Sequence, residues 1–265
     1  MITPATREPT CELSALKRLR IGCVRYLNSK PLIHGFEGEL LLEHPSVLAR
    51  DLAAGRLDAA LVPVFEILRD PQYAIVDDVA IACDGAVYSV ILAHGGELHT
   101  VQRIALDPAS MTSANLLRVL LAEYHGMKPE MGKAADAQLI IGNQAIEFRA
   151  RHEHDPGLHI LDLGEEWKRN TGLAFVFAAW ALRSDLPNLS GVANAFRALK
   201  STGLAHREEI IREDRTGTLE FRNRYLTEYI RFDLRAPEKE GLLKYRALLH
   251  QHGLIGSDQP PLQFV

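Results

Sequence analysis

Short apolar runs alternate along this chain with stretches in which apolar residues recur at helical spacing. Arg20–Val24 and Ala59–Val62 are strand candidates, and Ser46–Ala54 between them has an apolar helical face that ends at Gly55. A chain that repeats strand, helix and strand folds as an α/β protein, because each helix packs back over the sheet before the next strand. The alternation therefore predicts an α/β fold with a largely parallel sheet.

Two apolar runs are longer than the others and flank a segment with its own α/β rhythm. They are Val87–Ala93 and Phe175–Leu182. One run enters the middle segment and the other leaves it, so we expect two lobes joined by a two-strand hinge. The first lobe comprises residues 1–94 and 175–265, and the second comprises residues 95–174.

The remaining elements follow the same periodicities. We expect strands at Arg103–Leu106 and Gln138–Ile141, helices at Thr112–His125 and Gln144–Arg151, and C-terminal helices that include Leu219–Arg231 and Glu238–His250. The C-terminal helices are expected to pack back on the first lobe.

Charge and hydropathy exclude several classes of protein. The net charge is −4 over 265 residues, so we expect no nucleic-acid partner. Met1–Arg20 lacks the apolar core of a signal peptide, and the longest apolar runs are too short to span a membrane. We therefore expect a cytoplasmic protein with no membrane association, and the oligomeric state stays open.

Metal and nucleotide motifs are weak or missing. Cys11, Cys23 and Cys83 do not have the spacing of a zinc site or a redox pair. His152-Glu153-His154 and His250-Gln251-His252 are better explained as solvated surface, because an H-x-H pair alone is a weak metal signal. The glycine-rich nucleotide motifs and the serine-hydrolase motif do not occur. We therefore expect neither a metal nor a cofactor.

Polar side chains gather in loops that follow the predicted strands, where ligands of open α/β sheets bind. Arg25 and Asn28 lie in the loop after the first strand, and Asn28 is either a wall of a carboxylate site or a helix cap. Ser89 lies inside an apolar strand, so its hydroxyl bonds either to a neighbouring backbone group or to a ligand in the cleft.

Two further loops lead into helices. Ser110-Met111-Thr112-Ser113 opens one helix, and Asn143 follows a strand at the start of another. Such residues commonly cap helices, and the same geometry binds carboxylates through free backbone N–H groups and hydroxyls. From the residues alone, the chain is a two-lobed binder of a small anion, and catalysis is not shown.

The same loops, taken in order, resemble those of a known enzyme family. Val24-Arg25-Tyr26-Leu27-Asn28-Ser29-Lys30-Pro31-Leu32 resembles the Y/F-L-N-x-x-P-L motif of the chorismate dehydratases, which belong to the futalosine route to menaquinone. The other matching segments are Pro45–Pro63, Cys83-Asp84-Gly85 with Ser89, Thr112-Ser113, Ile141-Gly142, Asp162–Lys168 and Thr171–Ala181. Together they cover residues 20–182, and the C-terminal helices match only in type.

The resemblance implies a two-lobed, periplasmic-binding-protein-like type II fold and a dehydration of chorismate to 3-(1-carboxyvinyloxy)benzoate. It implies that Asn28 and Ser89 are catalytic. It also implies a substrate site that includes Arg25, Ser110, Thr112, Ser113 and Asn143. The family reaction uses no metal, and the carboxylate of the substrate itself can accept the ring proton.

Two departures from the family pattern bear on the substrate. Met111 stands where the family commonly has arginine in S-R-T-S, and Asn143 stands where it commonly has aspartate in I-G-D. One alternative is the sister dihydroxynaphthoate synthase, whose leading loop usually reads P-N-D rather than Leu27-Asn28-Ser29. Another is a non-catalytic cytoplasmic protein that binds or senses a small carboxylate.

Overall fold

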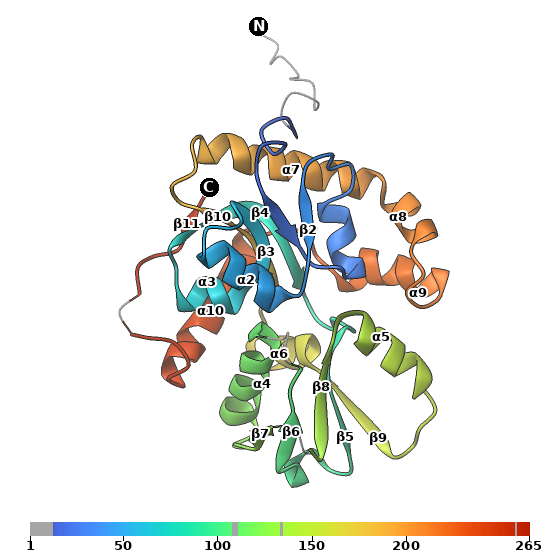
Figure 1. Cartoon of the computed structure of the whole chain (residues 1–265). Helices are drawn as coiled ribbons and strands as arrows, with labels where there is room; N and C mark the ends of the chain where they lie inside the picture. The colour runs from blue at the N-terminus through green and yellow to red at the C-terminus, as the bar shows by residue number, and fades with distance from the viewer. Residues whose placement is uncertain (1–12, 108–110, 133–134, 258) are drawn as a thin grey trace, which may run out of the picture.

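Two β-sheets, one of six strands and one of five, form the framework of the protein (Figure 1). The computed structural model describes residues 13–107, 111–132, 135–257 and 259–265. None of the helices within these ranges combines the length and the apolar character needed to cross a bilayer.

The six-stranded sheet has the order β11-β4-β10-β3-β1-β2. β1 pairs in parallel with β2 and β3, whereas β10 pairs antiparallel with β3 and β4. Every residue of β3 is buried, as expected for a strand covered on both faces. The strands are β1 (Ile21–Cys23), β2 (Leu40–Leu42), β3 (Ala59–Pro63), β4 (Tyr73–Cys83), β10 (Phe175–Arg183) and β11 (Gln263–Phe264).

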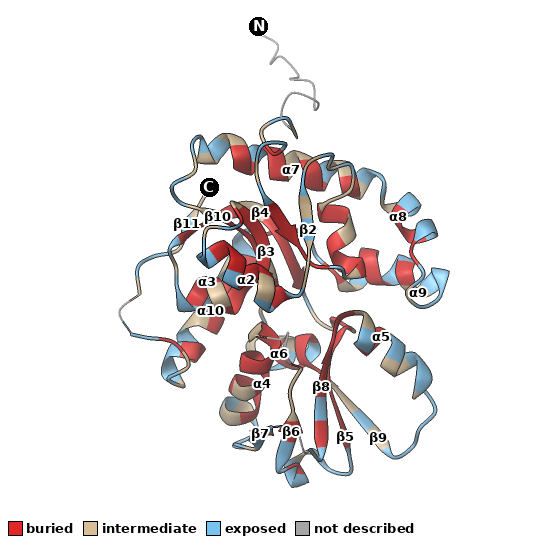
Figure 2. Ribbon diagram, viewed as in Figure 1, coloured by how far each residue is buried: buried red, intermediate tan, exposed pale blue. Residues whose placement is uncertain are grey.

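The five-stranded sheet has the order β7-β6-β8-β5-β9. β6 pairs in parallel with β7 and β8, and β5 pairs antiparallel with β8 and β9. Figure 2 shows that the central strands β3, β4 and β10 of the six-stranded sheet and strands β5 and β8 of this one are largely buried. The strands are β5 (Val90–Gly95), β6 (Arg103–Ala105), β7 (Glu130–Gly132), β8 (Ala137–Ile141) and β9 (Leu158–Asp162).

Helices connect the strands and extend the C-terminal part of the chain around the first sheet (Figure 1). The α-helices are α2 (Pro45–Ala53), α3 (Val64–Arg69), α4 (Met111–Tyr124), α5 (Gly142–Arg151), α6 (Leu163–Thr171), α7 (Leu189–Ala205), α8 (Arg207–Glu213), α9 (Leu219–Arg224) and α10 (Ala236–Gln251). The short helices are η1 (Leu27–Leu32), η2 (Leu98–Thr100) and the π-helical η3 (Tyr225–Tyr229).

The α/β class is confirmed, but the expectation of a largely parallel sheet is wrong. Both sheets are mixed, because β10 pairs antiparallel with β3 and β4 in the first sheet and β5 pairs antiparallel with β8 and β9 in the second. The long strand β4 and the pair β9–α6 were not predicted. The helix expected over Leu219–Arg231 is divided, since α9 gives way to the π-helical η3.

The chain passes between the sheets twice. Residues 84–89 connect β4 to β5, and residues 172–174 connect α6 to β10. The apolar run expected at Val87–Ala93 forms a strand only from Val90, and that strand pairs within the five-stranded sheet. The lobe boundary expected at residue 94 thus falls inside β5.

Candidate active site

A cavity lies where the two sheets approach each other, and residues of both sheets line it. Strands β1, β3 and β8 point their carboxyl ends toward it, as expected for ligand sites of open α/β sheets. Among the described residues that line it, none is charged. The apolar wall includes Val24, Leu61, Ile81, Val90, Ile141 and Phe177, and the polar groups come from Tyr26, Asn28, Ser89, Thr112 and Ser113.

Three side chains from distant parts of the sequence form a hydrogen-bonded chain at this cavity. The hydroxyl of Tyr225 donates to Ser89 Oγ over 2.7 Å, and Asn28 Nδ2 donates to the same Tyr225 oxygen over 3.1 Å. All three residues are buried, with Asn28 only 8% exposed. The C-terminal η3 thus holds together the two residues that the sequence assigned to catalysis.

The direction of these bonds leaves specific groups for a ligand. Burial raises the pKa of Tyr225 above its ordinary value, so the phenol stays protonated and acts as the donor to Ser89. Ser89 Oγ therefore accepts from Tyr225 and keeps its own proton for another acceptor. Within the described part of the chain, the buried Oδ1 of Asn28 has no hydrogen-bond partner. A ligand hydroxyl is the kind of donor that satisfies it.

Strained backbone places Ser89. The preceding residue, Tyr88, has φ = 66°, a left-handed conformation that is costly for a bulky side chain. Asp162 stabilises it, because its carboxylate accepts from the backbone N–H of Val87 over 3.0 Å and of Tyr88 over 2.7 Å. Arg149 pairs with Asp162 at 2.9 Å and lies over the Tyr88 ring at 4.3 Å.

The segment that begins at Asp162 explains one of the motifs. Asp162 also caps α6, since its side chain accepts from the backbone N–H of Gly164 and Glu165. A Cβ at Gly164 would lie 2.6 Å from the carbonyl oxygen of Gly85 and 2.7 Å from Cys83 Sγ. Only glycine lets α6 pack this closely against the 84–89 connection.

Thr112 and Ser113, two residues of the predicted substrate site, line the cavity from α4. Thr112 Oγ1 accepts from the backbone N–H of Phe65, and its carbonyl accepts from the hydroxyl of Tyr245. Met111 also lines the cavity, at the position where the family commonly has arginine. Ser110, the other residue predicted here, lies outside the described residues.

Tyr26 and Gly142 meet across the cavity rim. Gly142 has φ = 63°, and a Cβ there would lie 2.6 Å from the Tyr26 ring, so glycine is required on both counts. Burial, and secondarily the charge of Asp107, raises the pKa of Tyr26 to about 12. The phenol therefore stays neutral at physiological pH.

Asn143 neither caps α5 nor lines the cavity. Its Oδ1 accepts from the backbone N–H of Leu27 and its Nδ2 donates to Thr216 Oγ1, both over 3.2 Å. The residue bridges α5, η1 and the C-terminal segment. Because an amide carries both a donor and an acceptor, asparagine makes both bonds, whereas an ionised aspartate accepts only.

Neither cation of the loop after β1, the predicted Arg25 or the nearby Lys30, is among the residues that line the cavity. Arg25 is exposed, and its Nε donates to the carbonyl of Leu42. Lys30 pairs with Asp214 at 2.6 Å. Positive potential at the cavity comes instead from helix starts, because Pro45 of α2, Gly142 of α5 and the first described turn of α4 all line it.

Comparison with known proteins shows the family to which this sequence belongs. The model of the menaquinone biosynthesis family matches residues 19–251. The chain belongs to this family. A chorismate dehydratase of Thermus thermophilus is 30% identical over 256 residues, which cover 86% of this chain and 94% of that protein. A chorismate dehydratase of Campylobacter jejuni is 32% identical over 158 residues, or 59% of this chain and 60% of the relative.

Solved structures show the fold that this family member shares. A protein of Archaeoglobus fulgidus superposes with a TM-score of 0.72 at 18% sequence identity, and the match covers 89% of this chain and 98% of the other protein's chain. A Candida albicans protein described as having the generic periplasmic-binding-protein fold gives 0.65 at 14% identity, covering 91% and 92%. The predicted periplasmic-binding-protein-like fold is confirmed.

Sequence reasoning missed Tyr225, the residue that joins the two predicted catalytic positions. It lies in the C-terminal stretch where the family resemblance covers only the type of element, and no local motif distinguishes it. Asp162 was part of a matching motif, but its role as acceptor for the amides before Ser89 becomes visible only when β9 and the 84–89 connection lie side by side.

Proposed function

We propose that this member of the menaquinone biosynthesis family is a chorismate dehydratase that acts in the cytoplasm and gives 3-(1-carboxyvinyloxy)benzoate. The observation that carries the proposal is the chain Asn28–Tyr225–Ser89 at a neutral cavity, with Asn28 Oδ1 buried and unpaired among the described residues. Two relatives that carry the same activity name support it.

The chemistry asks little of a protein beyond positioning and exclusion of water. Chorismate loses its ring hydroxyl and a ring proton, and the ring becomes aromatic, which makes the elimination strongly downhill. A cavity walled by aliphatic side chains and a few neutral donors holds the substrate in one reactive shape and shields it from solvent. No step of this elimination needs a change of oxidation state by a cofactor.

The bond directions assign roles at the departing oxygen. The ring hydroxyl donates to Asn28 Oδ1, and the free proton of Ser89 Oγ is directed to the same oxygen as the C–O bond breaks. The ring C–H proton passes to a carboxylate of the substrate, and the C–H electron pair completes the aromatic ring. The carboxylic acid formed in this way gives the proton to the departing hydroxyl, which leaves as water. Among the described residues, the hydroxyl of Tyr225 bonds Asn28 and Ser89, so Tyr225 is a positioning residue in this proposal.

The two carboxylates of chorismate are bound by neutral groups in this proposal. The hydroxyls of Thr112 and Ser113 and the helix starts that line the cavity supply the donors. Met111 replaces a family arginine, so the binding energy for one carboxylate rests on hydrogen bonds rather than on an ion pair. We also propose that the lobes hinge at residues 84–89 and 172–174.

The test is direct. The purified chain is incubated with chorismate, and the products are followed by mass spectrometry and ultraviolet absorbance. We expect a product lighter than chorismate by one water, and no such product from Asn28→Ala. Tight binding of chorismate without turnover would instead support a carboxylate sensor, and the proposal would fail.

A further inference from the structure

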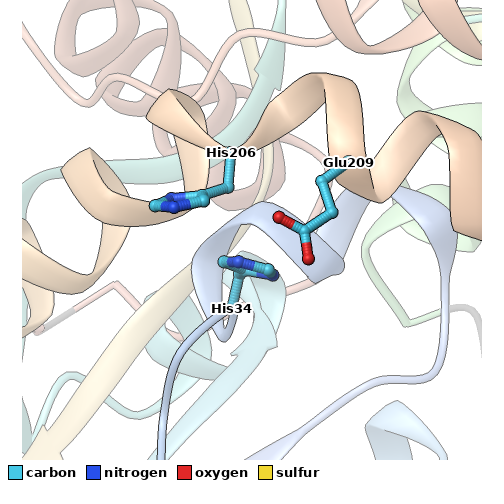
Figure 3. Close-up of side chains that lie close together, drawn as sticks. All are labelled: His34, His206 and Glu209. Carbon is cyan, nitrogen blue, oxygen red and sulfur yellow. The ribbon is translucent and has the colours of Figure 1, made fainter.

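Outside the lining of the cavity, two histidines and a glutamate from separate segments converge on the protein surface (Figure 3). His34 follows the end of η1, while His206 and Glu209 lie at the junction of α7 and α8. One ligand atom of each lies within 4.8 Å of the other two. We propose that these three side chains bind a divalent transition metal, with Zn²⁺ the best fit.

The donor set has the chemistry that zinc prefers. Two imidazole nitrogens and one carboxylate oxygen, completed by water, form a common four-coordinate zinc site. The ring centroids of His34 and His206 are 5.0 Å apart. Donors on a tetrahedral zinc ion lie about 3.3 Å from each other. The three ligand atoms, which all lie within 4.8 Å of one another, must therefore move closer together when the ion binds.

The orientation of His206 supports the assignment. Its Nδ1 lies 2.8 Å from the carbonyl oxygen of Thr202. A carbonyl only accepts, so Nδ1 carries the proton and Nε2 keeps its lone pair for a metal. Ligating histidines commonly hold their second ring nitrogen against a backbone carbonyl in this way, which fixes the tautomer.

The backbones that carry the ligands are held in place without a metal. A Cβ at Gly203 would lie 1.8 Å from the carbonyl oxygen of Pro31, so η1 and α7 are in direct backbone contact there. The same contact fixes the spacing between His34 and His206. Because η1 also carries Asn28, an ion at this site would pin the outer end of the helix that forms one wall of the cavity.

Zinc binding to the whole purified protein, first stripped with a chelator, tests the site. Titration calorimetry with ZnCl₂ is expected to show one tight equivalent for wild type, and the affinity is expected to fall at least about tenfold in His34→Ala, His206→Ala and Glu209→Gln. The exposed neighbour Glu208 and the distant exposed His99 provide matched controls, Glu208→Gln and His99→Ala, which should bind as wild type does.

Thermal unfolding gives a second readout that does not depend on catalysis. Free zinc at about 100 times its Kd should raise the midpoint of wild type by about 5 °C and leave His206→Ala unchanged. Absence of a tight equivalent in wild type would overturn the proposal, as would equal affinity in His206→Ala and Glu208→Gln. Neither result bears on turnover of chorismate.

Discussion

The two connections between the sheets differ in the contacts that hold them in place. Residues 84–89 are held by polar groups: Asp84 pairs with Lys168 and Arg231, and Asp162 accepts from two consecutive backbone amides. Residues 172–174 combine backbone hydrogen bonds with close packing. Lys168 Nζ donates to the carbonyl of Gly172, and the N–H of Leu173 donates to Thr171 Oγ1. The indole of the fully buried Trp167 donates to the carbonyl of Ala174, and a Cβ at Gly241 would lie only 1.8 Å from the same oxygen.

This difference separates chemistry from stability. The polar connection, residues 84–89, contains the strained residue Tyr88 and places Ser89 at the cavity. Its hydrogen bonds and ion pairs therefore serve mainly to orient the Ser89 hydroxyl. The packed connection contributes no side chain to the described lining of the cavity. We therefore expect changes near the first to reduce turnover, and changes near the second to reduce stability.

The largest effect is expected at the end of the polar connection. Ser89→Ala removes the donor to the departing oxygen, and kcat for chorismate should fall about 100- to 1000-fold, the cost of one lost transition-state donor. Steady-state kinetics measures this, and thermal unfolding should show a nearly unchanged midpoint. Ser201→Ala, on the exposed face of α7, is the matched control. Wild-type turnover in Ser89→Ala would remove Ser89 from the mechanism.

A change at the packed connection should have the reverse outcome. Gly241→Ala forces α10 away from Ala174, and the free energy of unfolding should fall by about 3 kcal/mol, as in other overpacked cores. Denaturant unfolding measures it, while kcat per folded molecule should stay at the wild-type value. Gly256→Ala, where an added Cβ contacts nothing, is the control. If Gly241→Ala lost kcat and kept its stability, the proposed division between a connection for turnover and a connection for stability would be wrong.

Two buried tyrosines allow a closer test. Tyr225→Phe removes the hydroxyl that bridges Ser89 and Asn28. Tyr245→Phe removes a hydroxyl whose partner among the described residues is the backbone carbonyl of Thr112. Each should lower the free energy of unfolding by about 1 kcal/mol. Only Tyr225→Phe should lower kcat, by about tenfold, with KM little changed. Equal kinetic losses in the two variants would show that Tyr225 has no special positioning role.

Titration of the buried thiols of Cys23 and Cys83 tests whether water reaches the interior beside the polar connection. Burial raises the pKa of Cys23 to about 12, and burial together with the nearby Asp162 charge raises that of Cys83. Because both pKa values are higher in the folded state, the stabilisation is intact below about pH 9 and is lost as the pH rises toward the folded values.

The expected slope is about 1.4 kcal/mol per pH unit for each buried thiol. Denaturant unfolding from pH 9 to pH 10, with a reductant present and Cys11→Ser as background, measures it. Cys83→Ala should lower the slope by the contribution of one buried thiol, about 1.4 kcal/mol per pH unit. Rapid reaction of Cys83 with a thiol reagent at pH 8 in the native protein would show that water enters beside the 84–89 connection.

Part of the site was accessible to sequence reasoning because polar residues in apolar surroundings are informative. Ser89 in an apolar run and Asn28 after a strand end were both located this way, and both line the cavity, although the strand begins only after Ser89. Arg25 and Asn143 follow the same rule but have other partners, since a loop residue chooses among neighbours that the sequence does not reveal.

The sequence by itself determined the α/β class, the family and the order of the polar loops, because these depend on local periodicity and on motifs read along the chain. Tertiary structure alone decided which loops meet. Tyr225, Asp162 and the cluster around His34 act through partners far away in sequence, and a hydrogen bond depends on distance and direction rather than on residue type. Only the packing of two mixed sheets supplies that distance and direction.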